Sequence, residues 1–549
     1  MNNDWFFEKF ALIADAPGAV ARMRQLILTL AIQGKLVPQD PEDESAQELI
    51  SRVISEKLRL VQSKEIKDES HINAIADDEV FGIPSNWVWC RAGALSKPIS
   101  SGSTPEQHVF HPSEGIPYLK VYNIQNQKVD FEYKPQFITI SYHREKMKRS
   151  RLVPGDVVMN IVGPPLGKVA IIPDRFPEWN CNQAISFFRP VFPELAPWIY
   201  TFLKEGSFLR NIQLIGTAGQ DNISVTKCKF IPIAIPPLAE QKRIVAKVDE
   251  LLGLCDALES QQQERELRKS VLVRSSLSRF AESPTPENLG YLFHKSYDIP
   301  PSELRKSILT LAVQGKLVPQ DPNDEPASSI LEATQSFFKR LVAEKKLSEP
   351  KPLPRIDDQE EPFSLPLGWE WCRLGHVIRI SSGDGLTAND MVDGPFPVFG
   401  GNGVNGYHNQ GNVSKRTLVI GRVGFYCGSI HITPAKAWVT DNAFITTFND
   451  EHLDLDFLRW LLKATDLRKR DNATAQPVIS GAKIYPTILG LPPLAEQRRI
   501  VAKVDQLMAL VDELERQQDE SRKKASNFLD AIVQEMTSGG RGIAATLES

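Results

Sequence analysis

Apolar residues recur at spacings of three and four along two stretches of the chain. The positions are Ile244, Val248, Leu251, Cys255 and Leu258 in the first stretch, and Ile500, Val504, Leu507, Val511 and Leu514 in the second. Charged residues lie off this seam, as in the a/d pattern of a coiled-coil helix. A pair of prolines precedes each stretch and suits a helix N-terminus. The pattern predicts two long helices, at 236–282 and 492–538.

Each predicted helix continues into a polar tract, QQQERELRK at 261–269 and RQQDESRKK at 516–524. A single amphipathic helix packed on a globular domain would also show an apolar stripe. The polar tracts have little to bury in such a core, so we favour two long helices that pair with each other. A helix from Leu238 to Phe280 would be about 60 Å long.

The seam belongs to an internal repeat. The repeated blocks pair residues 27–44 with 308–325, 87–93 with 369–375, and 235–259 with 491–515. The first pair, around QGKLVPQDP, is identical at 16 of 18 positions, and the third, around PPLAEQ, at 18 of 25. Ser45-x-x-Glu48 and Ser329-x-x-Glu332, which follow the first block of each copy, predict capping boxes at the start of charged helices.

Between the second and third blocks the two copies barely align. These fillings, 94–234 and 376–490, contain 141 and 115 residues, so the first is 26 residues longer. Both are rich in glycine, proline, aromatic and β-branched residues, which favours compact β or α+β domains. Both end in Gln-x-x-Ile-Ser and place two glycines four residues apart, Gly163 with Gly167 and Gly424 with Gly428. We predict one fold with two different surfaces.

Charge is divided unequally between the fillings and the rest of the chain, which contains the repeated blocks and which we call the frame. The chain has 64 basic and 68 acidic residues, a net charge of -4. Residues 85–235 hold 17 basic and 11 acidic residues (+6), and 369–491 hold 12 and 11 (+1), so the remainder carries -4 - 7 = -11. The basic tracts HREKMKRSR at 143–151 and RKR at 468–470 could contact phosphates, although such clusters are often only solvated surface.

Polar and basic side chains in the fillings are the candidates for nucleic-acid contact. They are Lys120, Asn123, Lys148, Arg149, Asn160, Lys168 and Gln220 in the first filling, and Asn402, Tyr407 and Arg422 in the second. The glycine-rich loop GGNGVNGY at 400–407 would let a ligand approach the backbone closely. Alternatively, these glycines only form turns that the asparagine caps.

The frame resembles that of the specificity subunits of type I restriction–modification systems over nearly the whole chain. PPLAEQ(K/R)RIVAKVD, present twice at the head of a long helix, is the most specific element, and QGKLVP and GWEWCRLG also match. The resemblance implies two target-recognition domains, each of which reads one half of a split, asymmetric DNA sequence. It also implies that the two long helices form an antiparallel coiled coil, whose length would set the number of unread base pairs. The arm at 1–20 departs from the family pattern.

The same resemblance implies partners. Two modification (methyltransferase) subunits would bind the frame, restriction subunits would join for cleavage, and double-stranded DNA would be the ligand. S-adenosylmethionine, ATP and Mg²⁺ would belong to those partners and not to this chain.

The residues themselves show no catalytic motif. Gly163-Pro164-Pro165-Leu166 lacks the polar head and the aromatic residue of an amino-methyltransferase tetrapeptide, and no phosphate-binding G-x-x-x-x-G-K-[ST] loop occurs. His108 and His111 have no obvious third partner for a metal. Two alternatives stay open beside a non-catalytic DNA-recognition subunit. One is a self-contained methyltransferase or nuclease, and the other is a coiled-coil scaffold whose domains bind something other than DNA.

We therefore expect an α+β protein with two similar globular domains separated by an antiparallel coiled coil, in a pseudo-twofold repeat. The predicted segments are an N-terminal arm and frame (1–84), domain 1 (85–235), a central helix (236–282), a connecting frame and linker (283–365), domain 2 (366–491), a distal helix (492–538) and a tail (539–549). The six cysteines occur singly, and no uncharged apolar stretch reaches the roughly 18 residues of a membrane span. A reducing cytoplasm is the expected compartment.

Overall fold

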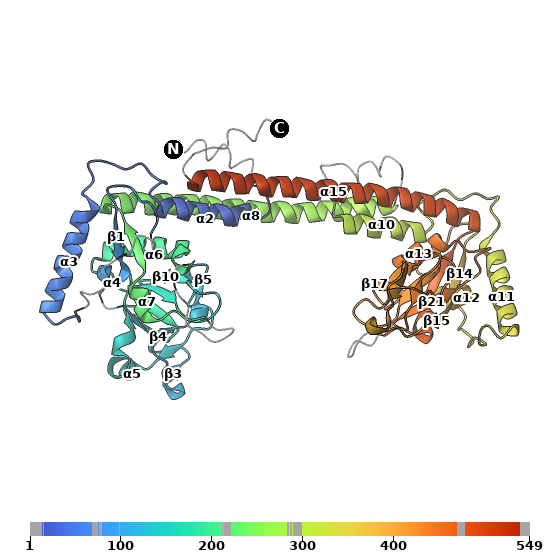
Figure 1. The fold of residues 1–549 in the computed structure, drawn as a ribbon, viewed down its shortest axis with the longest axis horizontal. Helices are drawn as coiled ribbons and strands as arrows, with labels where there is room; N and C mark the ends of the chain where they lie inside the picture. The colour runs from blue at the N-terminus through green and yellow to red at the C-terminus, as the bar shows by residue number, and fades with distance from the viewer. Residues whose placement is uncertain are drawn as a thin grey trace. The chain divides into compact units, whose positions relative to one another are not determined.

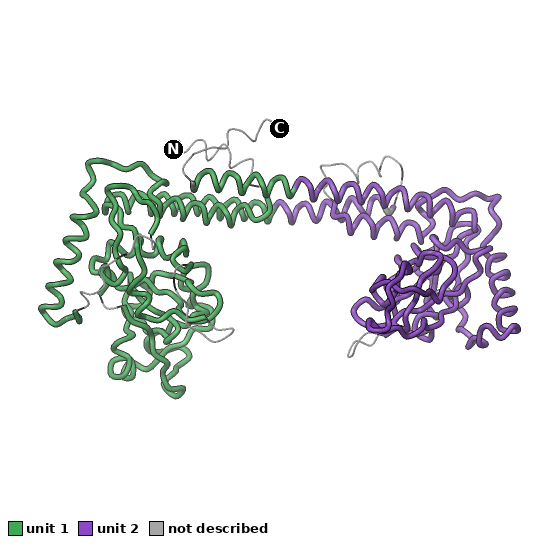
Figure 2. The backbone as a smooth tube through the Cα atoms, viewed as in Figure 1, with its two compact units in different colours: residues 1–264, 522–549 green, residues 265–521 purple. Residues whose placement is uncertain are grey.

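A computed structural model gives the fold. It describes residues 14, 16–68, 75, 80–97, 99–210, 212, 221–282, 285, 288, 299–468 and 478–538. Contacts divide the chain into two compact units, residues 1–264 with 522–549 and residues 265–521 (Figure 2). Each unit holds one globular domain, part of each long helix and one set of frame helices (Figure 1).

The two predicted long helices are present as α8 (Leu238–Glu282) and α15 (Leu494–Ser538), each 45 residues long. In the first unit the start of α8 shares a core with the end of α15, through Ile244, Val248, Leu251, Leu529, Ile532 and Met536. In the second unit the start of α15 shares a core with the end of α8, through Ile500, Val504, Leu507, Val273 and Phe280. The helices therefore run antiparallel within each unit.

The two apolar seams do not face each other, because they lie in different units. Eight of the ten predicted seam residues are at most 5% exposed, and Leu258 and Leu514 are partly buried. Each seam is covered by the polar half of the other long helix and by a short frame helix, α2 (Ala19–Ile32) or α10 (Pro301–Val313). The expected antiparallel pair is present, and a short frame helix joins it in each unit to give a three-helix packing, since the polar tracts alone offer few apolar side chains.

Polar contacts repeat between the two frames. Asp43 accepts hydrogen bonds of 3.1 and 2.7 Å from Arg243, and Asp324 accepts bonds of 3.3 and 2.6 Å from Arg499. The hydrogen bond from Arg243 lowers the pKa of Asp43. The same duplication links Arg24 to Asp256 and Glu259, and Arg305 to Asp512 and Glu515. The two frames therefore repeat these ion pairs at equivalent positions.

The frame helices α3 (Ala46–Gln62) and α11 (Ala327–Ala343) follow the first repeated block. Ser45 and Glu48 form the predicted capping box of α3. The box predicted at Ser329 and Glu332 is wrong, because α11 begins two residues before Ser329, directly after Pro326.

In the first unit, a ribbon of β1 and β13 closes the globular domain, with Val88 opposite Ile235 and Arg91 opposite Pro232. One sheet has the order β10-β9-β12-β2 and a second has the order β3-β7-β4-β11-β8. The strands are β1 (Val88–Arg91), β2 (Ser100–Ser101), β3 (Phe110–His111), β4 (Ile116–Leu119), β5 (Ile124–Gln125), β6 (Lys128–Val129), β7 (Phe137–Ile138), β8 (Arg151–Leu152), β9 (Val157–Asn160), β10 (Val169–Ile171), β11 (Trp179–Cys181), β12 (Ile185–Phe188) and β13 (Pro232–Ile235). The helices are α4 (Ala92–Leu95), α5 (Ile140–Glu145), α6 (Ala196–Glu205) and α7 (Val225–Lys229).

In the second unit, β14 and β22 form the same closing ribbon, with Glu370 opposite Leu491. One sheet has the order β15-β21-β18-β19 and the other β17-β16-β20. The strands are β14 (Glu370–Arg373), β15 (Arg379–Ser382), β16 (Phe396–Gly400), β17 (Gly403–His408), β18 (Leu418–Gly421), β19 (Ile430–Ile432), β20 (Trp438–Val439), β21 (Ala443–Thr447) and β22 (Ile488–Leu491). The helices are α12 (Leu374–Val377), α13 (Leu455–Ala464) and α14 (Gly481–Ile484).

The two domains share one fold despite their unlike sequences. Read in chain order, both four-stranded sheets have the same neighbours, with β9 matching β18 and β12 matching β21. The second sheets share a parallel pair, β4 with β11 and β16 with β20. The first domain adds strands and α5 around this pair, which accounts for its extra length.

Candidate nucleic-acid interface

The most closely matched feature of the two domains is a tight turn at one end of the four-stranded sheet. It joins β9 to β10 at Gly163–Gly167 and β18 to β19 at Gly424–Gly428. All four glycines have positive φ, between 75° and 85°, a region that L side chains rarely adopt. The glycine pairs found in the sequence thus mark one structural element.

The Ile-Ser ends of the repeated tracts hold these turns in place. The backbone N–H of Ile223 donates to the carbonyl of Ile161, and that of Ile479 donates to the carbonyl of Arg422. Gln220, a predicted contact residue, lies outside the described residues.

Different residues support the turn from below. In the first domain Asn160 is 1% exposed, donates to the carbonyl of Pro165 at 2.8 Å and accepts from the N–H of Lys168 at 2.6 Å. In the second domain Gly421 takes this place, and a Cβ there would lie 2.3 Å from the carbonyl oxygen of Gly401. A side chain supports the first turn, whereas close backbone packing supports the second.

The tips of both turns are apolar and exposed. Pro164 and Pro165 are exposed in the first domain. Phe425 and Tyr426 are 80% and 51% exposed in the second, and their rings meet edge to face at 5.1 Å. Our sequence-based candidates did not include these four residues. The signal was available, since apolar residues between two aligned glycines are unusual for a solvent-facing turn.

The first domain carries a basic module on its second sheet, built partly from β4 and β7. Val109, Tyr118, Ile138 and Met147 form a small core of their own within it. Lys148 and Arg149 follow Met147 as an exposed turn of 3-10 helix (Lys148–Ser150). Lys120 follows β4, and its Nζ lies over the rings of Phe110 and Tyr122 at 5.2 and 6.0 Å.

The same module buries one histidine. Asn180 donates to His143 Nδ1 at 3.0 Å, which leaves Nε2 to donate to Glu178 at 3.0 Å. Burial lowers the pKa of His143. Glu178 also pairs with Arg151, so this cation of the basic tract is partly neutralised.

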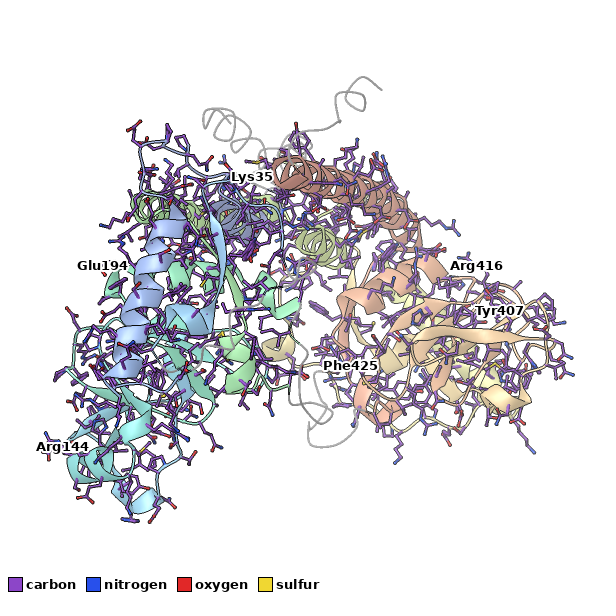
Figure 3. The ribbon with its side chains drawn as sticks, turned by 60° about the vertical axis from the view of Figure 1, so that its left-hand side comes forward. Lys35, Arg144, Glu194, Tyr407, Arg416 and Phe425 are labelled. Carbon is purple, nitrogen blue, oxygen red and sulfur yellow. The ribbon has the colours of Figure 1, made fainter. Side chains whose placement is uncertain are left out.

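The second domain presents a hairpin in place of the basic module. β16 and β17 pair through Gly400 and Gly403, with the exposed Asn402 at the bend. Tyr407, on β17, is 57% exposed (Figure 3). Arg422 lies at the foot of the Gly424 turn, next to the bend of this hairpin, because Gly401 packs against Gly421 and Val423. It donates to Ser382 and to the carbonyl of Asp441.

Two of the predicted contact residues are corrected. Asn123 is fully buried, accepts from the backbone N–H of Lys120 and donates to the carbonyls of Asp130 and Tyr133. The side chain of Asn160 is hydrogen-bonded to the carbonyl of Pro165 and the N–H of Lys168 in the turn described above. Both side chains organise backbone rather than face a ligand, and they are withdrawn as candidates for base contact. Lys120, Lys148, Arg149, Lys168, Asn402, Tyr407 and Arg422 remain predictions.

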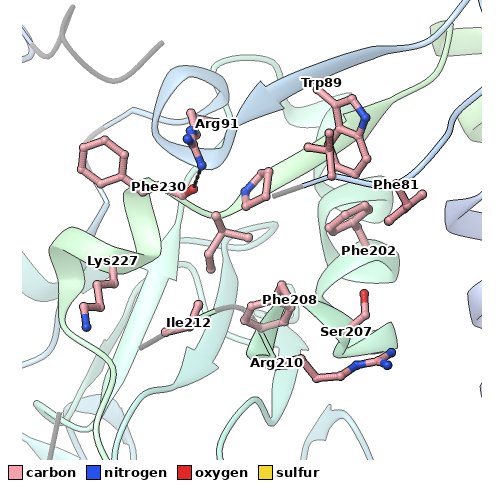
Figure 4. A pocket seen from close by; sticks show the side chains of 13 residues that line it. Phe81, Trp89, Arg91, Phe202, Ser207, Phe208, Arg210, Ile212, Lys227 and Phe230 are labelled. Carbon is pink, nitrogen blue, oxygen red and sulfur yellow. Dashed lines mark hydrogen bonds between the residues drawn. The ribbon is translucent and has the colours of Figure 1, made fainter. Parts of the chain in front are cut away.

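A cavity of about 550 Å³ lies in the first unit between β1, β13, α6 and α7 (Figure 4). Trp89, Phe202 and Phe230 line it, together with Arg91, which donates to the carbonyl of Phe230 at 2.6 Å. The matching Arg373 of the second unit donates to linker residues Pro354, Arg355 and Glu360. The equivalent first linker falls partly outside the described residues, so the cavity is not assigned a ligand.

Among the helices that the structure describes, none is both long enough and apolar enough for a bilayer crossing. Within the same residues, no set of three or more His, Cys, Asp or Glu side chains is grouped to hold a metal ion.

The fold and its surfaces define a class of protein: a duplicated recognition protein, with two equal frames that present unequal domains. The chain matches the family described as "Type I restriction modification DNA specificity domain" over residues 84–269 and 366–521, which is more than half its length. It therefore belongs to that family of DNA specificity proteins, as the frame motifs predicted.

Curated relatives agree with this assignment. The chain is 27% identical to the EcoEI specificity subunit of Escherichia coli over 94% of this chain and 93% of that one. It is 33% identical to the EcoAI specificity subunit of the same organism over 66% of this chain and 63% of the relative's length. These names agree with the prediction of a non-catalytic specificity subunit.

Solved structures show similar chains at lower similarity. One, from work on complex assembly and conformational transition of the type I R-M system, is 20% identical, with a TM-score of 0.48 over 84% of this chain and all of that chain. The HsdS subunit from Thermoanaerobacter tengcongensis is 19% identical, with a TM-score of 0.41 over 84% and 98%. Independently of these two structures, the helices and strands of this chain and its two matched family regions confirm the predicted α+β class, with two similar domains and two long helices.

Proposed function

We propose that this chain is the DNA-reading subunit of a type I restriction–modification complex, in which each globular domain reads one half of a split, asymmetric sequence. The observation that carries the proposal is the contrast within one chain. Two frames repeat the same ion pairs, while two domains of one fold present a basic module in one case and a neutral hairpin in the other. Equal frames with unequal surfaces suit an asymmetric target held by equivalent partners.

The proposed partners are two modification subunits, one on each frame, with restriction subunits joining for cleavage. Exposed positions that match in both frames support this, because interior packing does not require them to be alike. Ala246 and Ala502 are exposed at equivalent positions of α8 and α15, and Leu254 and Leu510 are 49% and 48% exposed. A common partner that contacts both frames would account for the match.

S-adenosylmethionine, ATP and Mg²⁺ would be bound by those partner subunits, and the complex would work in the cytoplasm. The acidic frame and the weakly charged second domain also favour a division of labour, in which partners supply much of the phosphate contact.

Exchanging residues 94–234 for the corresponding filling of another family member tests the proposal. The complex should then methylate sites in which only one half has changed, as read by sequencing the methylated DNA. A change in both halves would contradict the division of labour.

The enzyme alternative has its own test. The purified chain would be incubated alone with DNA and S-adenosylmethionine, or with DNA and Mg²⁺. We expect no methylation and no cleavage, and turnover in either reaction would favour a self-contained enzyme. If no salt-dependent DNA affinity were found with the modification subunits present, the result would instead favour a scaffold with other ligands.

A further inference from the structure

The turn at Gly424–Gly428 exposes two aromatic side chains to solvent. Phe425, at 80%, is the most exposed large apolar side chain in the described part of the chain. Tyr426 lies against it, with the two rings at 86° to each other. Such an exposed aromatic pair is costly in water and is typical of a contact surface.

The backbone holds these rings in place. Cys427 is 3% exposed and anchors the turn beneath them, with its N–H donating to the carbonyl of Gly424 at 3.0 Å. The N–H of Gly428 donates to the carbonyl of Gly421 at 2.8 Å. The open space around Gly424 and its φ of 83° show that the turn needs glycine for its conformation and not for lack of room. A rigid turn loses little conformational entropy when its tip binds.

Positive charge flanks the aromatic tip. The exposed side chain of Arg468 lies beside the turn, since a Cβ at Gly428 would be 3.5 Å from its Cγ. Arg422 stands at the foot of the same turn. Cations beside an exposed apolar tip complement DNA, in which phosphates border grooves that offer base edges and thymine methyl groups.

The first domain repeats the arrangement with other side chains. Its turn exposes Pro164 and Pro165 and is followed by Lys168. An apolar tip beside a cation thus occurs in both domains, while the residues at the tip differ. That is the pattern expected of an element that meets different bases in the two halves of a target.

We propose that the Gly424–Gly428 turn enters a groove of the second half-site, where Phe425 and Tyr426 make apolar contacts with the bases while Arg468 contacts phosphate. The inference rests on the proposed function, because it assigns base contact to a part of the DNA-reading surface. The turn acts as a binding element and not as a catalytic one.

Salt titrations of DNA binding test the assignment. The full chain would be measured in complex with its modification subunits, on a duplex whose sequence comes from methylated sites of the wild-type system. The double variant F425A/Y426A should bind about tenfold more weakly, with an unchanged slope of log affinity against log salt. R468Q should lower that slope by about one.

L367A is the matched control, because Leu367 is 77% exposed in the same unit but lies outside the turn. We expect no change in its affinity or slope. Wild-type affinity in F425A/Y426A, or a reduced slope in that variant, would overturn the inference. So would relaxed base preference in the first half-site rather than the second. Failure of the wild-type complex to bind or methylate DNA would instead contradict the proposed function.

Discussion

The two globular domains share a four-stranded sheet and a glycine-bounded turn but differ in the sheet beside them. The first domain adds β3, β8 and α5 to its second sheet and carries exposed cations there, whereas the second keeps three strands and a neutral hairpin. The comparison separates two tasks. The shared sheet positions an apolar tip in both domains, and the variable sheet sets how much charge each domain brings to a polyanion.

Substituting Asn160 or Gly421, the residues beneath the two turns, should cause the largest losses of stability. N160A removes two strong hydrogen bonds from a buried site, and G421A places a Cβ 2.3 Å from a carbonyl oxygen. Each should cost about 3 kcal/mol of unfolding free energy, measured in urea. N160A should impair methylation through the first half-site only, and G421A through the second only.

G163A and G424A are matched controls, since both positions have open space and positive φ. They should cost about 1 kcal/mol each, from backbone strain alone. If N160A cost no more than G163A, the role given to the buried amide would be wrong.

The next largest effect should come from removing basic residues of the first domain, which should weaken DNA binding. K148Q/R149Q deletes two exposed cations of the basic module, so DNA binding by the complex should weaken about 30-fold at physiological salt. The slope of log affinity against log salt should fall by about 1.8. K339Q/R340Q removes an adjacent exposed pair from α11 of the frame and should leave the slope unchanged. Equal losses in the two double variants would mean that the basic tract is only solvated surface.

Much of this organisation could be predicted from the sequence, because one chain contains its own comparison. Repeated blocks marked the frame, and aligned glycines marked the turns. The helix seam identified buried positions, but not what covers Ile244 or Ile500. Periodicity reports which face is apolar and carries no information on a third helix that arrives from elsewhere in the chain.

The contact surface was harder to predict. Asn123 and Asn160 have the right chemistry for reading bases, yet both are consumed by backbone groups. Phe425 and Tyr426 have the opposite character, since aromatic residues next to a strand usually belong to the core, yet both are exposed. The aligned glycines could have pointed to the exposed apolar tips, but only the structure shows that the two asparagines are already paired.

The frames should respond equally where the domains do not. D43N and D324N each weaken one of two matched ion pairs, whose carboxylates are 8% and 9% exposed. Each variant should lose about 1–2 kcal/mol of unfolding free energy, with the two values within about 0.5 kcal/mol of each other. A large difference would show that the frames, although alike in sequence, are not energetically equivalent.

The smallest expected effect is a change in how strongly the stability of the protein depends on pH. Burial lowers the pKa of His143 in the folded state, so the unfolded chain binds more protons as pH falls. The stability that the neutral ring contributes is present above a pH of about 6.5 and is lost as pH falls below it. The amide of H143Q offers one acceptor and one donor group, as the neutral ring does, but cannot titrate. Between pH 7.5 and 5.5 it should therefore lose less stability in thermal unfolding than the wild type, by about 1 kcal/mol.

Burial also lowers the pKa of His431 in the second domain, so H143Q should not remove the acid sensitivity of that unit. Equal acid sensitivity of the first unit with and without His143 would place its titrating group elsewhere.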